Sequence, residues 1–312
     1  MKKTPKILIV GTGAIGSYYG GKLAASGAHV STLCRSDYDI VKSNGISIKS
    51  VDGDFNFIPK EVISQASDYS SKPDYVIVAT KVLPGLNVAG IIEDAIYPET
   101  TIVLLQNGID IEKPVANAFP ENEIISALAF ICANRIEYGM IHHMDYGRIV
   151  IGKYPLGTSS KIELLSRLLN KIGIDCQVDK NIITARWGKL IWNAPFNPIS
   201  VLAGGVNTKE IVENKETLNI AINVMKEVQK LARSSGHEIT DEFIQKNIDD
   251  TMTMKPYKTS MLLDFENKRP LEVEAILGNT VYIAKKFKIS IPYIKSLYGL
   301  LSLLNDNLIN KR

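Results

Sequence analysis

Polar side chains recur at four-residue spacing in a segment that is otherwise strongly apolar. They are Lys189, Asn193 and Asn197, and this spacing places them along one face of a predicted helix. Most neighbouring positions are apolar: Trp187, Leu190, Ile191, Trp192, Ala194 and Phe196. A helix that is apolar nearly all round is expected to be buried, and buried amide and ammonium groups need partners. The stripe therefore indicates a ligand cleft, in which a desolvated lysine could act as an acid or base near neutral pH.

Groups that could act together with this lysine follow later in the chain. They are Ser260 and the two carboxylates Glu272 and Glu274. A carboxylate beside Lys189 would hold the ammonium group in place and favour its charged form. The residues alone leave open which of the two glutamates faces the cleft.

Neither the histidines nor the cysteines suggest a metal site. His142 and His143 are adjacent and lack both the HExxH spacing and a nearby acidic ligand pair, so we expect them in a loop or at a strand end. No serine–histidine triad is evident. Cys34, Cys132 and Cys176 are widely spaced and form no CxxC motif, which favours buried thiols in a reduced compartment.

A glycine-rich turn near the N-terminus predicts a dinucleotide site. The apolar run at 6–10 leads directly into a GxGxxG motif, and a helix is expected to follow. In this context the glycines allow a tight turn and a close approach to a pyrophosphate, which the helix N-terminus attracts. The expected cofactor contacts are the six residues of the motif: Gly11, Thr12, Gly13, Ala14, Ile15 and Gly16.

The end of the second predicted strand favours NADP over NAD. An NAD site usually has an acidic residue about 20 residues beyond the motif, where it binds the ribose 2′-hydroxyl. Here Arg35 occupies that strand end, and a guanidinium group suits a 2′-phosphate. Asp37 comes slightly late and is interpreted as a turn residue. The alternative for Arg35 is a solvated loop charge.

Two further strand ends carry polar residues. The run at 75–80 is followed by Lys81, and the run at 101–105 is followed by Gln106, Asn107 and Gly108. Because ligands lie beyond the carboxyl ends of such strands, Lys81 and Asn107 are expected to face the same crevice. The Asn-Gly pair could instead be only a turn.

The elements that must position these residues divide the chain in two. Continuous apolar runs alternate with helical segments in the first half, which predicts a doubly wound parallel sheet. Strands are expected at 6–10, 29–33, 75–79, 101–105, 123–133 and 148–152, with a hairpin at 46–58 and a helix at 14–26. Helical periodicity then predicts helices at 184–203, 214–235, 241–254, 272–286 and 294–310. We therefore expect a Rossmann domain at 1–178 and an all-α domain at 179–312.

Composition limits the classes of protein that remain. The 312 residues are 45% hydrophobic and 22% charged, which excludes disordered and collagen-like chains. A net charge of +3 argues against a nucleic-acid binder that acts through bulk charge. The longest apolar run, at 124–133, is far shorter than the roughly 20 residues that span a bilayer. A cytoplasmic protein without a membrane segment is expected.

These residues resemble the ketopantoate reductases, also called 2-dehydropantoate 2-reductases, over nearly the whole chain. The matching positions are the glycine motif with Gly20, Cys34-Arg35, 79–81, 106–108, 139–152, Trp187 to Lys189 with Asn193 and Asn197, 260–264, 272–274 and 278–279. The resemblance implies a Rossmann domain, a helical domain, a substrate cleft between them, and NADPH as the hydride donor.

The resemblance also implies roles for individual residues. Lys189 would be the general acid, and Glu272, twelve residues after Ser260, would be the carboxylate that contacts both substrate and lysine. Substrate would be bound by Asn107, Asn193, Asn197 and Ser260, while Lys81 and Asn107 would lie at the nicotinamide end of the cleft. The implied reaction is the reduction of 2-dehydropantoate to (R)-pantoate in pantothenate and coenzyme A biosynthesis.

Two other functions remain open at this stage. One is the NADP-dependent reduction of another small 2-oxo acid, since a few pocket contacts can change the substrate. The other is a non-catalytic NADP-binding sensor, which the retained lysine and its polar neighbours disfavour. A monomer and a homodimer both fit the sequence, and feedback regulation leaves no sign in it.

Overall fold

A computed structural model describes residues 4–310 of the chain, and these residues form two compact units. The α/β unit comprises the residues up to Lys81 together with Leu86–Gln106 and Ile111–Ile182. The helical unit comprises Val82–Gly85, Asn107–Asp110 and the residues from Ile183 onward. Two short segments of the first half thus belong to the helical unit.

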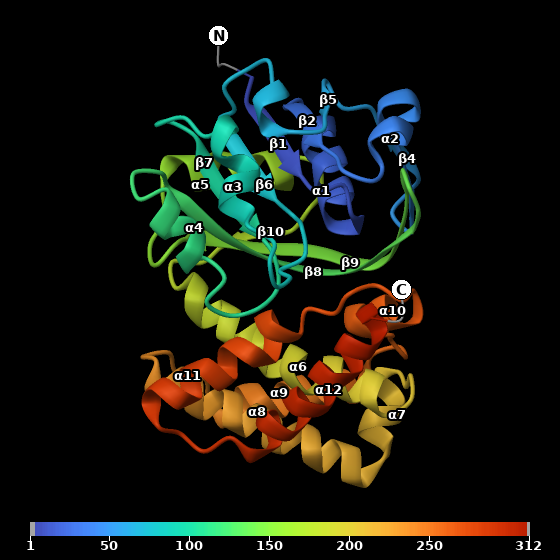
Figure 1. Cartoon of the computed structure of the whole chain (residues 1–312), viewed down its shortest axis with the longest axis vertical. Coiled ribbons are helices and arrows are strands. Elements are labelled where there is room, and N and C mark those ends of the chain that lie inside the picture. Colours follow the sequence, from blue (N-terminus) through green and yellow to red (C-terminus); the bar gives the residue numbers. More distant parts are fainter. Residues whose placement is uncertain (1–3, 311–312) are drawn as a thin grey trace. The chain divides into compact units, whose positions relative to one another are not determined.

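The described part of the α/β unit contains a ten-stranded sheet (Figure 1). Its strands are β1 (Lys6–Val10), β2 (His29–Leu33), β3 (Ile46–Ser50), β4 (Phe55–Phe57), β5 (Val62–Ile63), β6 (Tyr75–Val78), β7 (Thr101–Leu105), β8 (Ile124–Glu137), β9 (Met140–Lys153) and β10 (Cys176–Val178). The order is β4-β3-β9-β8-β7-β6-β1-β2-β5, and β10 pairs with β9. The part from β5 to β8 is parallel throughout. Its order is that of the doubly wound dinucleotide-binding fold, so the predicted fold class is confirmed.

Helices cover the sheet and connect its strands. They are α1 (Ala14–Ala25), α2 (Tyr38–Asn44), α3 (Val88–Ile92), α4 (Lys113–Ala118) and α5 (Ser160–Asn170), with short 3-10 turns η1 (Ala66–Asp68) and η2 (Glu93–Ala95). In β1, Ile7 and Ile9 belong to a core that also includes Tyr18 and Tyr19 of α1. Leu8, which points to the opposite face, is equally buried. Burial on both faces explains why these strands are continuous apolar runs.

The strands β8 and β9 extend well beyond their predicted ends. They form a long antiparallel hairpin, visible as two curved strands running together in Figure 1. The first residues of β9, 140–143, pair in parallel with β3 as well as antiparallel with β8. Their mixed polar sequence did not predict a strand. The expectation of a loop or strand-end position for the two histidines is wrong, because His142 and His143 lie inside β9 and pair with Lys49 and Ser50.

The helical unit is built around one long buried helix. Its elements are α6 (Ile182–Leu202), α7 (Thr208–Glu213), α8 (Lys215–Ser234), α9 (Asp241–Thr253), α10 (Ser260–Glu266), a π-helical turn η3 (Glu274–Gly278), α11 (Asn279–Phe287) and α12 (Pro292–Asn310). Pro195 and Pro198 lie within α6, which continues through both of them. The apolar residues of α6 join those of α8, α11 and α12 in one core.

Three smaller expectations can be compared with these elements. The helix predicted at 272–286 is present at 273–287, where the π-helical turn η3 runs without a break into α11, and Glu272 directly precedes it. The three cysteines are buried thiols, as expected. No helix among the described residues is both long and apolar enough to cross a membrane.

Candidate functional site

The turn between β1 and α1 requires glycine at two positions. Gly11 has a φ of +97°, and a Cβ there would lie 2.9 Å from the side chain of Thr80. A Cβ on Gly16 would lie 2.1 Å from the carbonyl oxygen of Gly11. A Cβ on Gly13, in contrast, would meet nothing within 4 Å. The first and last glycines therefore pack the turn tightly, and the middle one leaves open space beside the backbone.

This open space lies at the N-terminal end of α1. Gly13 is the N-cap residue, and among the described residues no side chain caps this end and no acidic residue lies in the first turn. The first N–H groups of a helix carry a partial positive charge and lack partners within the helix. The end of α1 is therefore suited to an anionic group such as a phosphate.

A buried hydrogen bond links this turn to the end of β2. The Thr12 hydroxyl donates to Asp37 Oδ2 at 2.5 Å, and both residues are buried. Sequence reasoning interpreted Asp37 as a turn residue and missed this contact, although the residue lies close to the spacing of an NAD-type acid. Its carboxylate holds Thr12, while Arg35 at the same strand end is exposed.

The carboxyl ends of β6 and β7 are also joined. The Gln106 side-chain amide donates to the Thr80 carbonyl oxygen at 2.8 Å and to the Thr80 hydroxyl at 3.2 Å. Since Thr80 also packs on Gly11, three neighbouring strand ends meet at the glycine turn. Lys81, the residue after Thr80, is partly buried and ends this segment of the α/β unit.

The helical unit brings Lys189, Asn107 and Glu272 together, and we call these three residues the lysine cluster. Lys189 Nζ donates to Asn107 Oδ1 at 2.9 Å, and Asn107 Nδ2 donates to Glu272 Oε2 at 3.4 Å. The backbone N–H of Val82 donates to Glu272 Oε1 at 2.9 Å. The amide of Asn107 thus lies between the ammonium and the carboxylate and bonds to both. The carboxylate is fixed on its other side by the backbone.

The environment of Lys189 favours its neutral form more than water would. Burial and the positive charge of Arg186 together lower the pKa of Lys189 to about 7, against the opposing effect of Glu272. Desolvation is the largest of these causes. A lysine that exchanges its proton near neutral pH can serve as a general acid or base.

The two glutamates of the 272–274 segment occupy different surroundings. Glu272 belongs to the lysine cluster, whereas Glu274 Oε1 accepts a hydrogen bond from the Tyr298 hydroxyl at 2.8 Å. Glu272 and not Glu274 therefore contacts the lysine cluster, a choice that the residues alone had left open.

The predicted asparagine stripe lies on α6, one and two turns beyond Lys189. Asn193 is 9% exposed and Asn197 only 1%. Both amide atoms of Asn197 are buried without a hydrogen-bond partner among the described residues. Because buried amides are nearly always paired, this side chain is ready to bond a polar group that the protein itself does not supply.

The N-terminus of α10 lies beside the end of this stripe. The Ser200 hydroxyl, one turn after Asn197, is 2.7 Å from the hydroxyl of Thr259, which caps α10. Ser260 is the next residue and is exposed. The predicted residues Lys189, Asn193, Asn197 and Ser260 therefore follow one another from the lysine cluster along α6 to α10.

Arg186 is a buried charged residue that sequence reasoning did not single out. It is 1% exposed, and its Nη1 donates to the Gly108 carbonyl oxygen at 3.0 Å. Its position in the sequence could have indicated this, because a cation one helical turn before Lys189 is unusual on an apolar helix.

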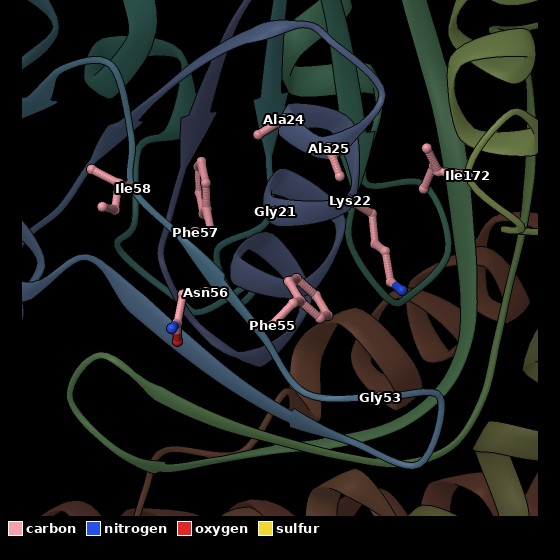
Figure 2. A pocket seen from close by; sticks show the side chains of 10 residues that line it. All are labelled: Gly21, Lys22, Ala24, Ala25, Gly53, Phe55, Asn56, Phe57, Ile58 and Ile172. Atoms are coloured by element: carbon pink, nitrogen blue, oxygen red, sulfur yellow. The ribbon is translucent and has the colours of Figure 1, made fainter.

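A hollow of about 450 Å³ lies elsewhere in the α/β unit, between α1 and the β3–β4 hairpin (Figure 2). Lys22 reaches over Phe55 there, with its ammonium 4.7 Å from the ring centre. None of the predicted cofactor-binding residues lines this hollow, so it is separate from the glycine turn.

Known proteins resemble this chain over both units. The profile of the family described as "Ketopantoate reductase PanE/ApbA" matches residues 7–155, and that of its C-terminal part matches residues 181–305. A 2-dehydropantoate 2-reductase of Nostoc sp. is 36% identical over 307 residues, covering 96% of this chain and 95% of that protein.

Solved structures give the same result. The crystal structure of 2-dehydropantoate 2-reductase from Methylococcus capsulatus is 45% identical, covers 97% of each chain and has a TM-score of 0.91. The enzyme of that name from Geobacter metallireducens is 32% identical, with a TM-score of 0.90 and coverage of 96% of this chain and 99% of that one. On these matches, the chain is an oxidoreductase that belongs to the ketopantoate reductase family.

Proposed function

We propose that the protein reduces 2-dehydropantoate to (R)-pantoate with NADPH, a step of pantothenate and coenzyme A biosynthesis. The observation that carries this proposal is the lysine cluster: a desolvated lysine with a pKa of about 7, bonded to an amide that also bonds a carboxylate. Relatives at 36% and 45% identity named for this reaction support the choice of substrate.

The glycine turn fits the phosphates of the cofactor. Gly13 leaves space beside the uncapped end of α1, and the motif residues from Gly11 to Gly16 would hold the pyrophosphate there. Arg35 would bind the 2′-phosphate, because Asp37 is already engaged with Thr12. When bound, NADPH supplies hydride to the C2 carbonyl carbon of the substrate.

Lys189 would supply the proton that this reduction requires. As the carbonyl oxygen gains negative charge, the ammonium group stabilises that charge and then protonates the oxygen. Asn107 accepts a hydrogen bond from Lys189 Nζ and so directs the ammonium group. Glu272 favours the protonated form of the lysine, which is the form that acts in this direction.

The polar residues along α6 would hold the rest of the substrate. Asn197 presents a buried amide with unused donor and acceptor atoms, which matches a carboxylate or hydroxyl group of a 2-oxo acid. Asn193 and Ser260 would complete this contact surface. Lys81, which directly follows the strand end at Thr80, would act at the nicotinamide end.

The test of the reaction is NADPH oxidation with 2-dehydropantoate and a panel of other 2-oxo acids. We expect 2-dehydropantoate to give the highest kcat/KM. Lys189→Ala should retain NADPH binding and lose turnover by about 10²- to 10⁴-fold, the range for a general acid. Turnover like that of the wild type in this variant would contradict the role of Lys189, and a different best substrate would contradict the choice of 2-dehydropantoate.

The cofactor preference has its own test. Arg35→Ala should raise the KM for NADPH and leave the KM for NADH nearly unchanged, because only NADPH carries the 2′-phosphate. An unchanged ratio between the two cofactors would show that another group recognises the phosphate.

A further inference from the structure

Arg186 is a buried cation one helical turn before Lys189 on α6. Its side chain is 1% exposed, and an arginine keeps its charge under all ordinary conditions. Burying a charge is costly unless it is well bonded, and placing it near a second cation adds repulsion. An arginine retained under these conditions needs an explanation beyond filling space in an apolar core.

One reason to keep Arg186 is that it helps to fix the segment Asn107–Asp110. Hydrogen bonds from the helical unit hold this segment at Gly108 and Ile109. The Arg186 guanidinium donates to the Gly108 carbonyl oxygen at 3.0 Å. The Ile109 N–H donates to the Ala275 carbonyl oxygen at 3.0 Å, and Asn279 Nδ2 donates to the Ile109 carbonyl oxygen at 2.6 Å. The residue just before this clamped turn is Asn107, the centre of the lysine cluster.

A second reason to keep Arg186 is the effect of its charge on Lys189. Among the described residues, the charged groups that shift the pKa of Lys189 include Arg186 from α6 and Glu272 from the segment before η3. They have opposite effects, because Arg186 favours the neutral lysine and Glu272 the protonated one. Together with desolvation, which is the largest cause, the balance between them sets how readily Lys189 releases its proton.

We propose that Arg186 is a positioning residue for the reduction: it holds the Gly108 carbonyl so that Asn107 stays on Lys189, and its fixed charge acts on the Lys189 ammonium group from one helical turn away. This inference rests on the proposed function for its kinetic consequences. The Arg186 guanidinium is bonded to the Gly108 carbonyl oxygen, so it acts through its neighbours.

Two substitutions separate the hydrogen bond from the charge. Arg186→Gln keeps a neutral donor for the Gly108 carbonyl and removes the charge, whereas Arg186→Lys keeps the charge and removes the planar fork. Arg186→Met removes both. The measurement is kcat/KM for 2-dehydropantoate as a function of pH, whose alkaline limb reports the pKa of the proton donor in the free enzyme.

The expected results differ among the variants. The wild-type limb should lie near pH 7. Arg186→Gln should move it upward by roughly one pH unit and retain most of the plateau rate. Arg186→Lys should leave the limb in place and lower the plateau several-fold. Glu272→Gln marks the opposite direction, because loss of the carboxylate should move the limb to lower pH.

A second readout does not depend on the substrate. The pKa of Lys189 can be followed by NMR in protein labelled with ¹³C-lysine, with Lys189→Met to assign the signal. If the wild type fails to reduce 2-dehydropantoate but Arg186→Gln raises the pKa of Lys189, the proposed function fails and the tuning by Arg186 stands. If the variants lose only thermal stability, with both the limb and the NMR titration unchanged, Arg186 is purely structural and the inference is overturned.

Discussion

At the scale of the residue, the chemistry of Lys189 follows from its desolvation. Water stabilises an ammonium group strongly, so burial favours loss of its proton. The Asn107 side chain replaces one bond to water, and Glu272 offsets part of the penalty. The result is a lysine whose pKa of about 7 lies far below its usual value of 10.5.

This lowered pKa predicts how stability depends on pH. Between about pH 7 and pH 10 the unfolded chain holds the Lys189 proton and the folded protein has released it, so folding stability due to this group rises with pH there. The slope approaches about 1.4 kcal/mol per pH unit. Below about pH 7 both states are protonated and the full desolvation cost applies.

The measurement is urea unfolding of the wild type and Lys189→Met at several pH values. Methionine has a similar length and no charge, so the variant should be more stable than the wild type at about pH 6, with the advantage shrinking toward about pH 10. A constant difference across this range would mean that Lys189 titrates normally in the folded protein.

At the scale of the element, the sequence predicted best those segments that are buried along their whole length. The strands β1, β2 and β7 begin and end as predicted, because a buried parallel strand is a continuous apolar run. The stripe on α6 was likewise readable, since a polar side chain stands out on an apolar helix. The start of β9 was not predicted, because it lacks an apolar pattern and part of its pairing comes from β3, which is far away in sequence.

Two site residues were missed for the same reason, because their partners are distant in sequence. Asp37 and Arg186 owe their roles to Thr12 and to the Gly108 carbonyl, and neither partner is indicated by local periodicity. The π-helical hydrogen bonding of η3, at the start of the predicted 272–286 helix, also left no sign in the apolar spacing.

The turn that is clamped at residues 108 and 109 gives a prediction for one glycine. Gly108 has a φ of +105°, and a Cβ there would lie 2.5 Å from the Ala275 carbonyl oxygen. Gly108→Ala should therefore strain the backbone and push the turn away from η3, which costs about 1–3 kcal/mol and lowers turnover by displacing Asn107.

The matched control is Gly236→Ala, measured by the same thermal unfolding and turnover assays. Gly236 also has a positive φ, of +87°, but a Cβ there would meet nothing within 4 Å. It should lose some stability through the strained backbone and keep normal turnover. Equal losses of turnover in both variants would show that the contact with Ala275 is unimportant for the site.

At the scale of the whole molecule, the division into units does not follow the chain in one cut. The sequence suggested a boundary near residue 178. In the structure the α/β unit ends at Ile182, and the helical unit also takes in Val82–Gly85 and Asn107–Asp110. Both segments follow strands of the sheet. Asn107 belongs to the lysine cluster, and the Val82 N–H donates to Glu272 of that cluster. A boundary drawn from composition cannot detect such segments, because their few residues carry no periodicity of their own.

This division predicts which amide hydrogens exchange together. Cooperative units open as wholes in native-state hydrogen exchange. The Ile109 N–H, bonded to Ala275, should lose protection at the same denaturant concentration as the amides of α6 and α11. The amides of β7, only a few residues earlier in sequence, should follow β1 and β6 instead. Exchange by NMR or mass spectrometry at increasing urea distinguishes the two groups. If Ile109 opens with β7, the turn belongs to the sheet, and Asn107 is positioned by the strand rather than by the helical unit.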